Sequence, residues 1–435
     1  MGFGQGLSGL NAASQTLDVI GNNIANSGTA GFKGASAKFA DIYASSSIGL
    51  GVQTTAISQN FKVGNLESTG NQYDIAIDGP TGFFRLVDTN GEILFSRNGQ
   101  FLKDKDHYIV NAQGQQLTGY PPGLVGANPV PLQIPVGNVA PMATDKIQAT
   151  LNLNGNQDPI PPTVDFNPER PDTFNTAVPA TVYDSLGNSH QLTQYFVKRD
   201  PESIEAEVPN PDYDPQDPNS ERVITVTMLV SVWEVQYALG ETVLDAGGEP
   251  FKLYFDSAGR QVTTGVNPTT PTTANLLFSD PGRPGSPTEA LTIAVDYAGS
   301  TQFGSPFTQN IIPNGYASGE FVSVAFAEDG TIVANFTNGQ TSIVGTLVLA
   351  NFNNIQGLTP KGGNAWAESP TSGPAILGQP GSNGMSVVMG QAVEMSNVDL
   401  SQELVNLIIA QRTYQANAQT ISTQDQILQT LMQMR

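Results

Sequence analysis

The sequence predicts an α+β multidomain protein, in which terminal α-helices form a coiled-coil-like inner domain and antiparallel β-rich domains are inserted between them. Three observations predict this fold class. Both ends have the apolar spacing of amphipathic helices, the middle is rich in Val, Ile, Thr and Phe, and 45 Gly and 30 Pro indicate many turns. At 435 residues the chain exceeds the usual size of one domain, so more than one is expected.

The N-terminal segment predicts a helix with one apolar face. Apolar or small residues recur there at steps of three and four, namely Phe3, Leu7, Leu10, Ala13, Leu17, Ile20 and Ile24. The opposite face is polar but hardly charged, as Asn11 and Gln15 illustrate. Such a face suits a surface that meets other subunits as well as water.

Residues 31–72 predict an extended linker. Ser, Gly and Ala abound in this range, and strong apolar anchors are few. A segment of this composition buries too little apolar surface to become ordered alone. We therefore expect the linker to become ordered only in an assembled polymer.

The middle of the chain predicts hairpins that fold into sandwich- or barrel-like β domains. Short β-type runs are separated by turn signals such as Asp88-Thr89-Asn90-Gly91. Runs 82–87 and 92–96 are predicted to pair with each other, as are runs 321–327 and 332–336. Stretches 158–179 and 201–219 are dense in Pro and acidic residues, and predict linkers or long surface loops.

These elements predict a nested domain organisation, because the regular segments flank an irregular middle. The ends pair with each other, and the next segments inward pair likewise. The predicted parts are a helical inner domain (1–30 with 391–435), the extended linker (31–72), an inner β domain (73–146 with 316–390) and an outer β domain (147–315).

The C-terminal segment predicts a long helix with a coiled-coil seam. The seam positions alternate steps of four and three, at Leu400, Leu404, Leu407, Gln411, Tyr414, Ala418, Ile421, Asp425, Leu428 and Met432. Asp399 stands where an N-cap is expected, and Gln402 follows as in a capping box. Because this seam is longer than the N-terminal one, part of it requires another partner. Burial between subunits is our interpretation, and a coil within one subunit is the alternative.

The composition argues against several classes of partner. The formal charge of −21 disfavours nucleic acid and anionic membranes, because phosphate binding needs clustered Lys and Arg. No stretch reaches the roughly 18–20 apolar residues of a membrane span, so membrane insertion is not expected. The N-terminus lacks the basic and apolar regions of a secretory signal. Any export is therefore expected to proceed without a cleaved signal peptide.

The sequence singles out no catalytic, cofactor or metal site. The chain has no Cys, and its two histidines, His107 and His190, lie in polar turns without metal-ligand spacing. Asp184, Ser189 and His190 could be drawn as a triad, but no nucleophile elbow surrounds the serine. Glycosidase chemistry needs only two carboxylates, and no pair stands out. A structural protein rather than an enzyme is predicted.

Two terminal segments resemble a known family. The segment Ile20-Gly21-Asn22-Asn23-Ile24-Ala25-Asn26-Ser27-Gly28-Thr29-Ala30-Gly31-Phe32-Lys33 resembles the signature of the bacterial flagellar axial proteins, the rod and hook proteins. The C-terminal runs 396–404 and 410–425 are similar to the matching end of that family. The family motif comprises Asn22, Asn23, Ala25, Asn26, Gly31, Phe32 and Lys33. Within the family the length favours the hook proteins, since rod proteins lack so large a central insertion.

The resemblance implies a fold, a function and partners. Terminal helices would form an inner tube around an export channel, and the β domains would lie outside it. The subunit would polymerise into the flagellar hook, a flexible curved tube that couples rod to filament. The implied partners are copies of the chain, the distal rod protein, hook cap, hook–filament junction proteins and the type III export machinery. The implied location is the extracellular hook on the basal body. The residues expected in the tube wall are Leu7, Leu10, Leu17, Ile20, Ile24, Leu400, Leu404, Leu407, Gln411, Tyr414, Ile421 and Leu428.

Two alternatives remain open at this point. The chain could be a distal rod subunit with a large insertion. It could also be an extracellular carbohydrate-binding or adhesive β protein whose helical ends only oligomerise it. Polymer shape separates the first alternative from a hook subunit, and saturable glycan binding would favour the second.

Overall fold

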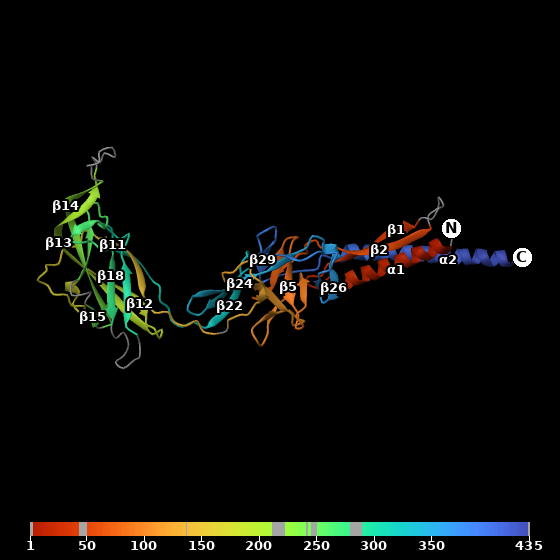
Figure 1. Cartoon of the computed structure of the whole chain (residues 1–435), viewed down its shortest axis with the longest axis horizontal. Coiled ribbons are helices and arrows are strands. Elements are labelled where there is room, and N and C mark those ends of the chain that lie inside the picture. The colour runs from red at the N-terminus through yellow and green to blue at the C-terminus, as the bar shows by residue number, and fades with distance from the viewer. Residues whose placement is uncertain are drawn as a thin grey trace. The chain divides into compact units, whose positions relative to one another are not determined.

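The chain forms two compact units. The structure, a computed structural model, describes residues 3–42, 50–135, 137–210, 222–240, 242–244, 250–278 and 289–433. The terminal unit comprises Met1–Gly137 and Phe321–Arg435, and the central unit comprises Asn138–Glu320 (Figure 1). The finer division of the terminal unit into helical, linker and inner β parts stays a prediction.

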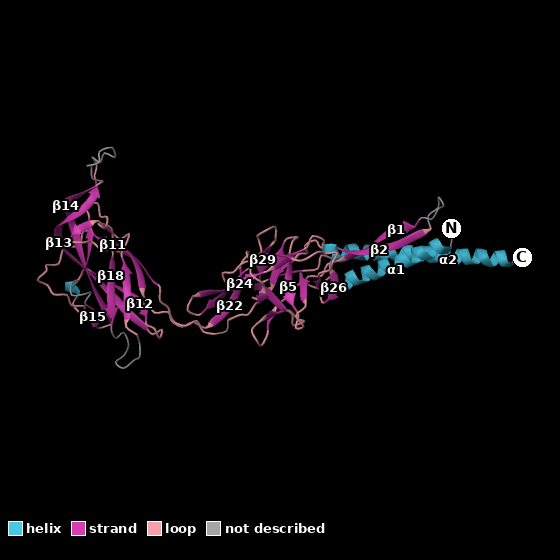
Figure 2. Cartoon of the chain, in the orientation of Figure 1, coloured by secondary structure: helices cyan, strands magenta, loops and turns pink. Residues whose placement is uncertain are grey.

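Helices form at both ends of the chain, as predicted. Helix α1 spans Phe3–Ala25 and α2 spans Leu400–Gln433 (Figure 2). The N-cap prediction is confirmed, because the Asp399 carboxylate accepts hydrogen bonds from the backbone of Ser401 and Gln402 at 2.9 and 3.2 Å. The capping-box interpretation is wrong for the Gln402 side chain, which donates to Asn406 at 3.1 Å instead. No described helix combines the length and apolar character that crossing a membrane requires.

The range predicted as an extended linker differs from that prediction. Strands β1 (Ala35–Ile42) and β2 (Gly51–Gln59) pair there as an antiparallel hairpin. The Val52 amide donates to the Ser8 hydroxyl of α1 at 3.3 Å, and the Trp366 indole donates to the Gln59 side chain at 2.8 Å. The hairpin forms because its backbone groups pair with each other and both its ends find partners distant in sequence. The amino-acid composition of residues 31–72 does not indicate these distant partners.

The β strands of the terminal unit come from both flanking segments and interleave. The predicted hairpins are confirmed, since β5 pairs with β6 and β22 with β23. Pairs β24–β9, β25–β5, β27–β6, β29–β4 and β3–β30 join the two flanking segments. The strands are β3 (Leu66–Ser68), β4 (Ile75–Asp78), β5 (Phe83–Val87), β6 (Ile93–Ser96), β7 (Leu102–Lys103), β8 (Ile109–Val110), β9 (Gln116–Tyr120), β10 (Val130–Pro131), β22 (Phe321–Phe326), β23 (Thr331–Phe336), β24 (Thr341–Leu347), β25 (Leu349–Asn351), β26 (Thr359–Gly362), β27 (Ala365–Ala367), β28 (Ile376–Gly378), β29 (Val387–Gly390) and β30 (Ala392–Glu394).

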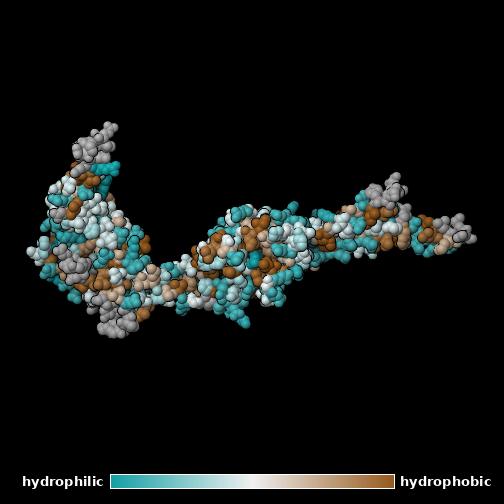
Figure 3. Space-filling model, viewed as in Figure 1, coloured by the Kyte–Doolittle hydropathy of each residue, from teal (hydrophilic) through white to brown (hydrophobic). Residues whose placement is uncertain are grey.

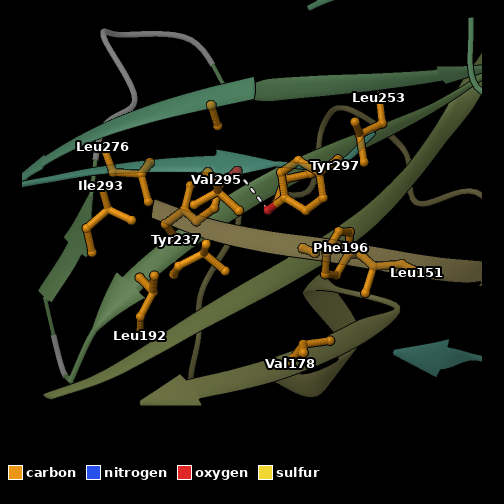
Figure 4. Close-up of a cluster of buried hydrophobic side chains, with 14 of the residues drawn as sticks. Leu151, Val178, Leu192, Phe196, Tyr237, Leu253, Leu276, Ile293, Val295 and Tyr297 are labelled. Atoms are coloured by element: carbon orange, nitrogen blue, oxygen red, sulfur yellow. Dashed lines mark hydrogen bonds between the residues drawn. The ribbon is translucent and has the colours of Figure 1, made fainter. Parts of the chain in front are cut away.

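The central unit packs two sheets around a large apolar core. Side chains of both sheets meet there, among them Phe196 and Tyr237 from one sheet and Ile293 and Tyr297 from the other (Figure 4). The Tyr237 and Tyr297 hydroxyls lie 2.9 Å apart, and burial raises the pKa of both phenols. The strands are β11 (Lys146–Asn154), β12 (Thr176–Tyr183), β13 (Ser189–Pro209), β14 (Val223–Leu239), β15 (Thr242–Leu244), β16 (Phe251–Phe255), β17 (Gly265–Asn267), β18 (Thr273–Phe278), β19 (Leu291–Asp296), β20 (Thr301–Phe303) and β21 (Thr308–Pro313).

The loop prediction is confirmed for most of residues 158–179, of which 176–179 belong to β12, and differs more from the structure at 201–219. The loop interpretation of residues 201–219 is wrong for 201–209, which continue β13, while 211–219 lie outside the described residues. Pro201 falls where the β13–β14 register shifts, and a residue without an N–H is tolerated at such a bulge. The stretch after 155 runs along β13, where the Lys198 ammonium donates to the Gly155 carbonyl at 2.6 Å and the Arg199 guanidinium donates to the Ile160 carbonyl at 3.0 Å.

Candidate assembly interface

Helices α1 and α2 pack antiparallel through small residues. A Cβ atom on Gly6 would lie 3.1 Å from Ile421, and one on Gly9 would lie 2.8 Å from the Asn417 amide. Ala13 and Ala410 are buried in the same contact region. Glycine and alanine thus let the two helices approach closely, and the contact within the chain needs few large apolar side chains.

The predicted seam of α2 largely lies off this contact. Leu407, Ala418 and Ile421 are half-buried, whereas the other predicted positions are exposed. Leu404 leaves 46% of its surface in water, and Tyr414 leaves 37%. The exposed predicted positions of α2 are Leu400, Leu404, Gln411, Tyr414, Asp425, Leu428 and Met432. The contact with α1 uses Ile421 of the seam and otherwise residues next to seam positions, such as Ala410 and Asn417.

Some predicted positions of α1 are buried within the chain, and others are exposed to solvent. Ile20 is buried, and the remaining positions become more exposed toward the N-terminus, where Leu7 leaves 45% of its surface in water. Leu10, Leu17 and Ile24 are half-buried. The apolar face of α1 is therefore covered within the chain except at its first positions, Phe3 and Leu7.

Sequence reasoning missed three large apolar residues on α2. Val405, Ile408 and Ile409 leave 51%, 51% and 58% of their surfaces exposed, although they fall outside the predicted seam. The run at 404–410, apolar except for Asn406, was the available signal, because a helix that is apolar on several faces is typically buried on several sides. We call the exposed residues Leu400, Leu404, Val405, Ile408, Tyr414 and Leu428 the α2 apolar surface.

The motif residue Asn23 joins three elements. Its side-chain amide exchanges hydrogen bonds with the backbone of Ala35 at 2.8 and 2.9 Å, and it donates to the Glu403 carboxylate at 3.2 Å. Only 2% of Asn23 is exposed. The amide therefore fixes the end of α1 against both the start of β1 and the first turn of α2.

The motif residue Lys33 lies in a buried group of charges. Its ammonium pairs with the Glu394 carboxylate at 2.5 Å, and that carboxylate also lies 3.3 Å from the Arg97 guanidinium. All three side chains are at most 1% exposed. Burial lowers the pKa of Lys33, and the neighbouring Glu394 carboxylate partly offsets that effect. Arg97 and Glu394 were not found from the sequence, because they lie far from the motif along the chain.

The remaining motif residues shape the turn between α1 and Lys33. The Asn26 side chain donates to the Asn22 carbonyl at 3.0 Å, at the end of the helix. Gly31 has a φ of +71° and is buried, so a Cβ atom there would lie 2.4 Å from the backbone nitrogen of Asn98. Phe32 is half-buried, and Asn22 and Ala25 are exposed. The motif is thus mainly a structural junction.

The candidate chemical groups have structural partners. The Asp184 carboxylate accepts hydrogen bonds from the backbone of Leu186 and Asn188 and lies 3.0 Å from the His190 ring. This group stabilises the turn between β12 and β13. Among the residues that the structure describes, no three His, Asp or Glu side chains are grouped to hold a metal ion.

Four family models match successive parts of the chain. The family described as flagella basal body rod protein matches residues 5–33, and the flagellar hook protein FlgE/F/G D1 domain matches residues 76–155. The flagellar basal body protein FlaE D2 domain matches residues 151–316. The flagellar basal body rod FlgEFG protein C-terminal family matches residues 389–434.

Full-length relatives and one solved structure are also similar. A flagellar hook protein FlgE from Escherichia coli (strain K12) is 41% identical over 441 residues, and one from Salmonella typhimurium is 42% identical over 442 residues, with 100% of both chains aligned in each case. The crystal structure of Helicobacter pylori flagellar hook protein FlgE2 has a TM-score of 0.50 at 15% identity, over 75% of this chain and 99% of that chain, and it supports the fold. The chain therefore belongs to the flagellar hook protein family.

Proposed function

We propose that this chain is the structural subunit that polymerises, through its terminal helices, into the flagellar hook, the curved tube that couples rod to filament and encloses the export channel. The observation that carries this proposal is the α2 apolar surface. Its six large side chains are each between 37% and 51% exposed in the single chain. Exposed large apolar side chains gathered as they are at 400–408 are typical of a protein–protein interface.

The energy available from this surface favours association. Fully burying one Leu, Ile or Val side chain stabilises a complex by about 1.5–3 kcal/mol relative to leaving it in water. Residues 400–433 carry only Glu403, Arg412 and Asp425 as charged groups. Copies of α2 can therefore pack side by side with little like-charge repulsion.

The packing within the chain supports burial between subunits over a coil within one subunit. Because α1 contacts α2 through Gly6, Gly9 and Ala13, the leucines of α2 stay available. We propose that the tube wall includes the assembly residues named from the sequence, together with Val405 and Ile408. Gln411 would then set register between neighbouring subunits.

Further partners follow from the proposed role. A hook subunit has to contact the distal rod protein at one end of the tube and the hook–filament junction proteins at the other, and it grows beneath a cap. We propose that the chain reaches this place through the flagellar type III export machinery, without a cleaved signal peptide. Its role is mechanical and requires no catalysis.

Replacing two exposed residues of the α2 apolar surface tests the proposal. Leu404→Asp combined with Ile408→Asp places two charges where copies would meet, and should abolish polymerisation while both units stay folded, because neither side chain is buried in the single chain. Sedimentation and electron microscopy measure the polymer, and circular dichroism measures folding. Leu404→Met combined with Ile408→Leu keeps both positions apolar, is the matched control and should polymerise normally.

Two outcomes would contradict the proposal. Normal tubes from the double variant would show that the α2 apolar surface is not buried between subunits. Straight rather than curved tubes from the unchanged chain would favour a rod subunit.

A further inference from the structure

We propose that the C-terminal end of α2 from a second copy docks in a groove between α1, α2 and the β1–β2 hairpin. This inference rests on the proposed function and names the contact that joins one subunit to the next. Three observations carry it: the groove, an exposed helix end that matches it, and the geometry that prevents the two from meeting within one chain.

The groove is apolar and of molecular size. It encloses about 500 Å³ and is lined on its three sides by Ala12 and Val19 of α1, Ala37 and Phe39 of β1, and Ile409 of α2. Ile409 and Phe39 leave 58% and 38% of their surfaces exposed. Large apolar side chains thus face solvent at its edges, and small ones form its walls, an arrangement that accepts the side chains of an incoming helix.

The groove exists because hydrogen bonds to α1 side chains hold the hairpin beside the helices. The Ala35 backbone is fastened to Asn23, and the Val52 amide to the Ser8 hydroxyl. These bonds fix the hairpin at both ends of its contact with α1. The groove is therefore preformed, and docking into it needs little rearrangement of the receiving copy.

The matching helix end extends past α1. Helix α2 has 34 residues and α1 has 23, and Gly6 near the start of α1 already lies beside Ile421. Beyond that point Ile427, Leu428 and Met432 leave 48%, 47% and 73% of their surfaces exposed. Apolar side chains remain visible at the C-terminal end of α2 (Figure 3). Leu428 and Met432 are four residues apart and therefore lie on the same face of the helix.

The helix end cannot reach the groove of its own chain. The last groove residue on α2 is Asn417, and Leu428 lies about 16 Å further along the same helix at 1.5 Å per residue. The occupant must therefore come from another molecule. A contact between two different surfaces of identical subunits is heterologous, and it propagates into a helical polymer when it does not close into a ring.

The few charged residues of the groove and of the α2 end allow the two surfaces to pair. Glu403 is the charged residue among those that line the groove, and its carboxylate already accepts a hydrogen bond from Asn23. The end of α2 from 424 to 433 carries only Asp425. The two surfaces therefore meet with little charge to desolvate.

Cysteine cross-linking tests the contact directly, because the chain contains no Cys. Ala37→Cys places a thiol in the groove and Leu428→Cys places one on the helix end, too far apart to join within one chain. In the polymer of the double variant, mild oxidation should give a ladder of covalent dimers, trimers and longer chains, at least about tenfold faster than in the control pair Ala37→Cys with Gln415→Cys. A mixture of the two single variants should stop at dimers.

Each result decides one question. If the unchanged chain forms no polymer, the proposed function fails. If polymers of the double variant form and oxidation yields only monomers, or a ladder no faster than the control pair, the docking is wrong. Should the reduced double variant not polymerise, Val52→Cys with Met432→Cys tests the same contact with the same expected ladder.

Discussion

At the scale of single residues, Glu394 holds the junction between the helices and the inner strands. Its carboxylate pairs with Lys33 and Arg97, and it also accepts a hydrogen bond from the Gly64 amide at 2.8 Å. Two buried cations share this one anion. Removing one member of a buried charge group is far more destabilising than losing a surface ion pair, because the partners stay buried without compensation.

Glu394→Gln should therefore destabilise the terminal unit by about 3–5 kcal/mol, since both cations lose their counter-charge. Glu67→Gln on the neighbouring strand β3 is the control, and should change stability by less than about 0.5 kcal/mol because Glu67 is exposed. Trp366 lies in the terminal unit and Trp233 in the central unit. Urea unfolding followed by ¹⁹F NMR of fluorotryptophan-labelled protein reports each unit separately. An equal loss in both variants would contradict this account.

At the scale of elements, the contact between α1 and α2 depends on the absence of side chains. Gly9 faces the Asn417 amide, whereas nothing lies within 4 Å of a Cβ atom placed on Gly21 of the same helix. The two glycines have the same intrinsic cost in a helix. They differ only in what a side chain would meet.

Gly9→Leu should separate the helices, because the new side chain occupies the space that the Asn417 amide now fills. Hydrogen exchange should then become faster in both α1 and α2, as each helix loses the other's protection. Gly21→Leu should leave exchange in α2 unchanged and slow that in α1 through improved helix propensity. Equal exchange in the two variants would show that the helices are not coupled through this contact.

At the scale of the whole molecule, charge is segregated along the chain. Residues 138–320 carry 23 Asp and Glu against 8 Lys and Arg, a formal charge of −15 out of −21. Residues 3–25 of α1 carry only Asp18, and α2 carries three charged groups. The helices can therefore pack densely, while the central units of neighbouring copies repel one another.

Polymerisation should consequently become more favourable as salt rises. Increasing NaCl from about 0.01 to 0.15 M shortens the Debye length from roughly 30 to 8 Å and screens repulsion between the central units. The critical concentration for assembly, measured by sedimentation, should fall across this range. A critical concentration that stays constant or rises with NaCl would contradict the proposed role of charge.

The sequence was most informative where the signal is local. The period of α1 and α2, the Asp399 cap and the turn glycines such as Gly91 depend on neighbours within a few residues, and these predictions were confirmed. The β1–β2 hairpin and the strand at 201–209 were missed. Their strand partners lie across loops or on other elements, and local composition there resembles that of a loop.

The sequence by itself determined that both ends are helical, that the middle consists of β hairpins, and that its terminal motif resembles flagellar axial proteins. Only the tertiary structure decided which face of α2 meets α1, and so which apolar residues remain exposed. It also decided that Lys33 is buried with Glu394 and Arg97. The physical reason is that a helical period shows that a face is apolar and leaves open what covers it, because the partner is set by contacts between residues hundreds of positions apart.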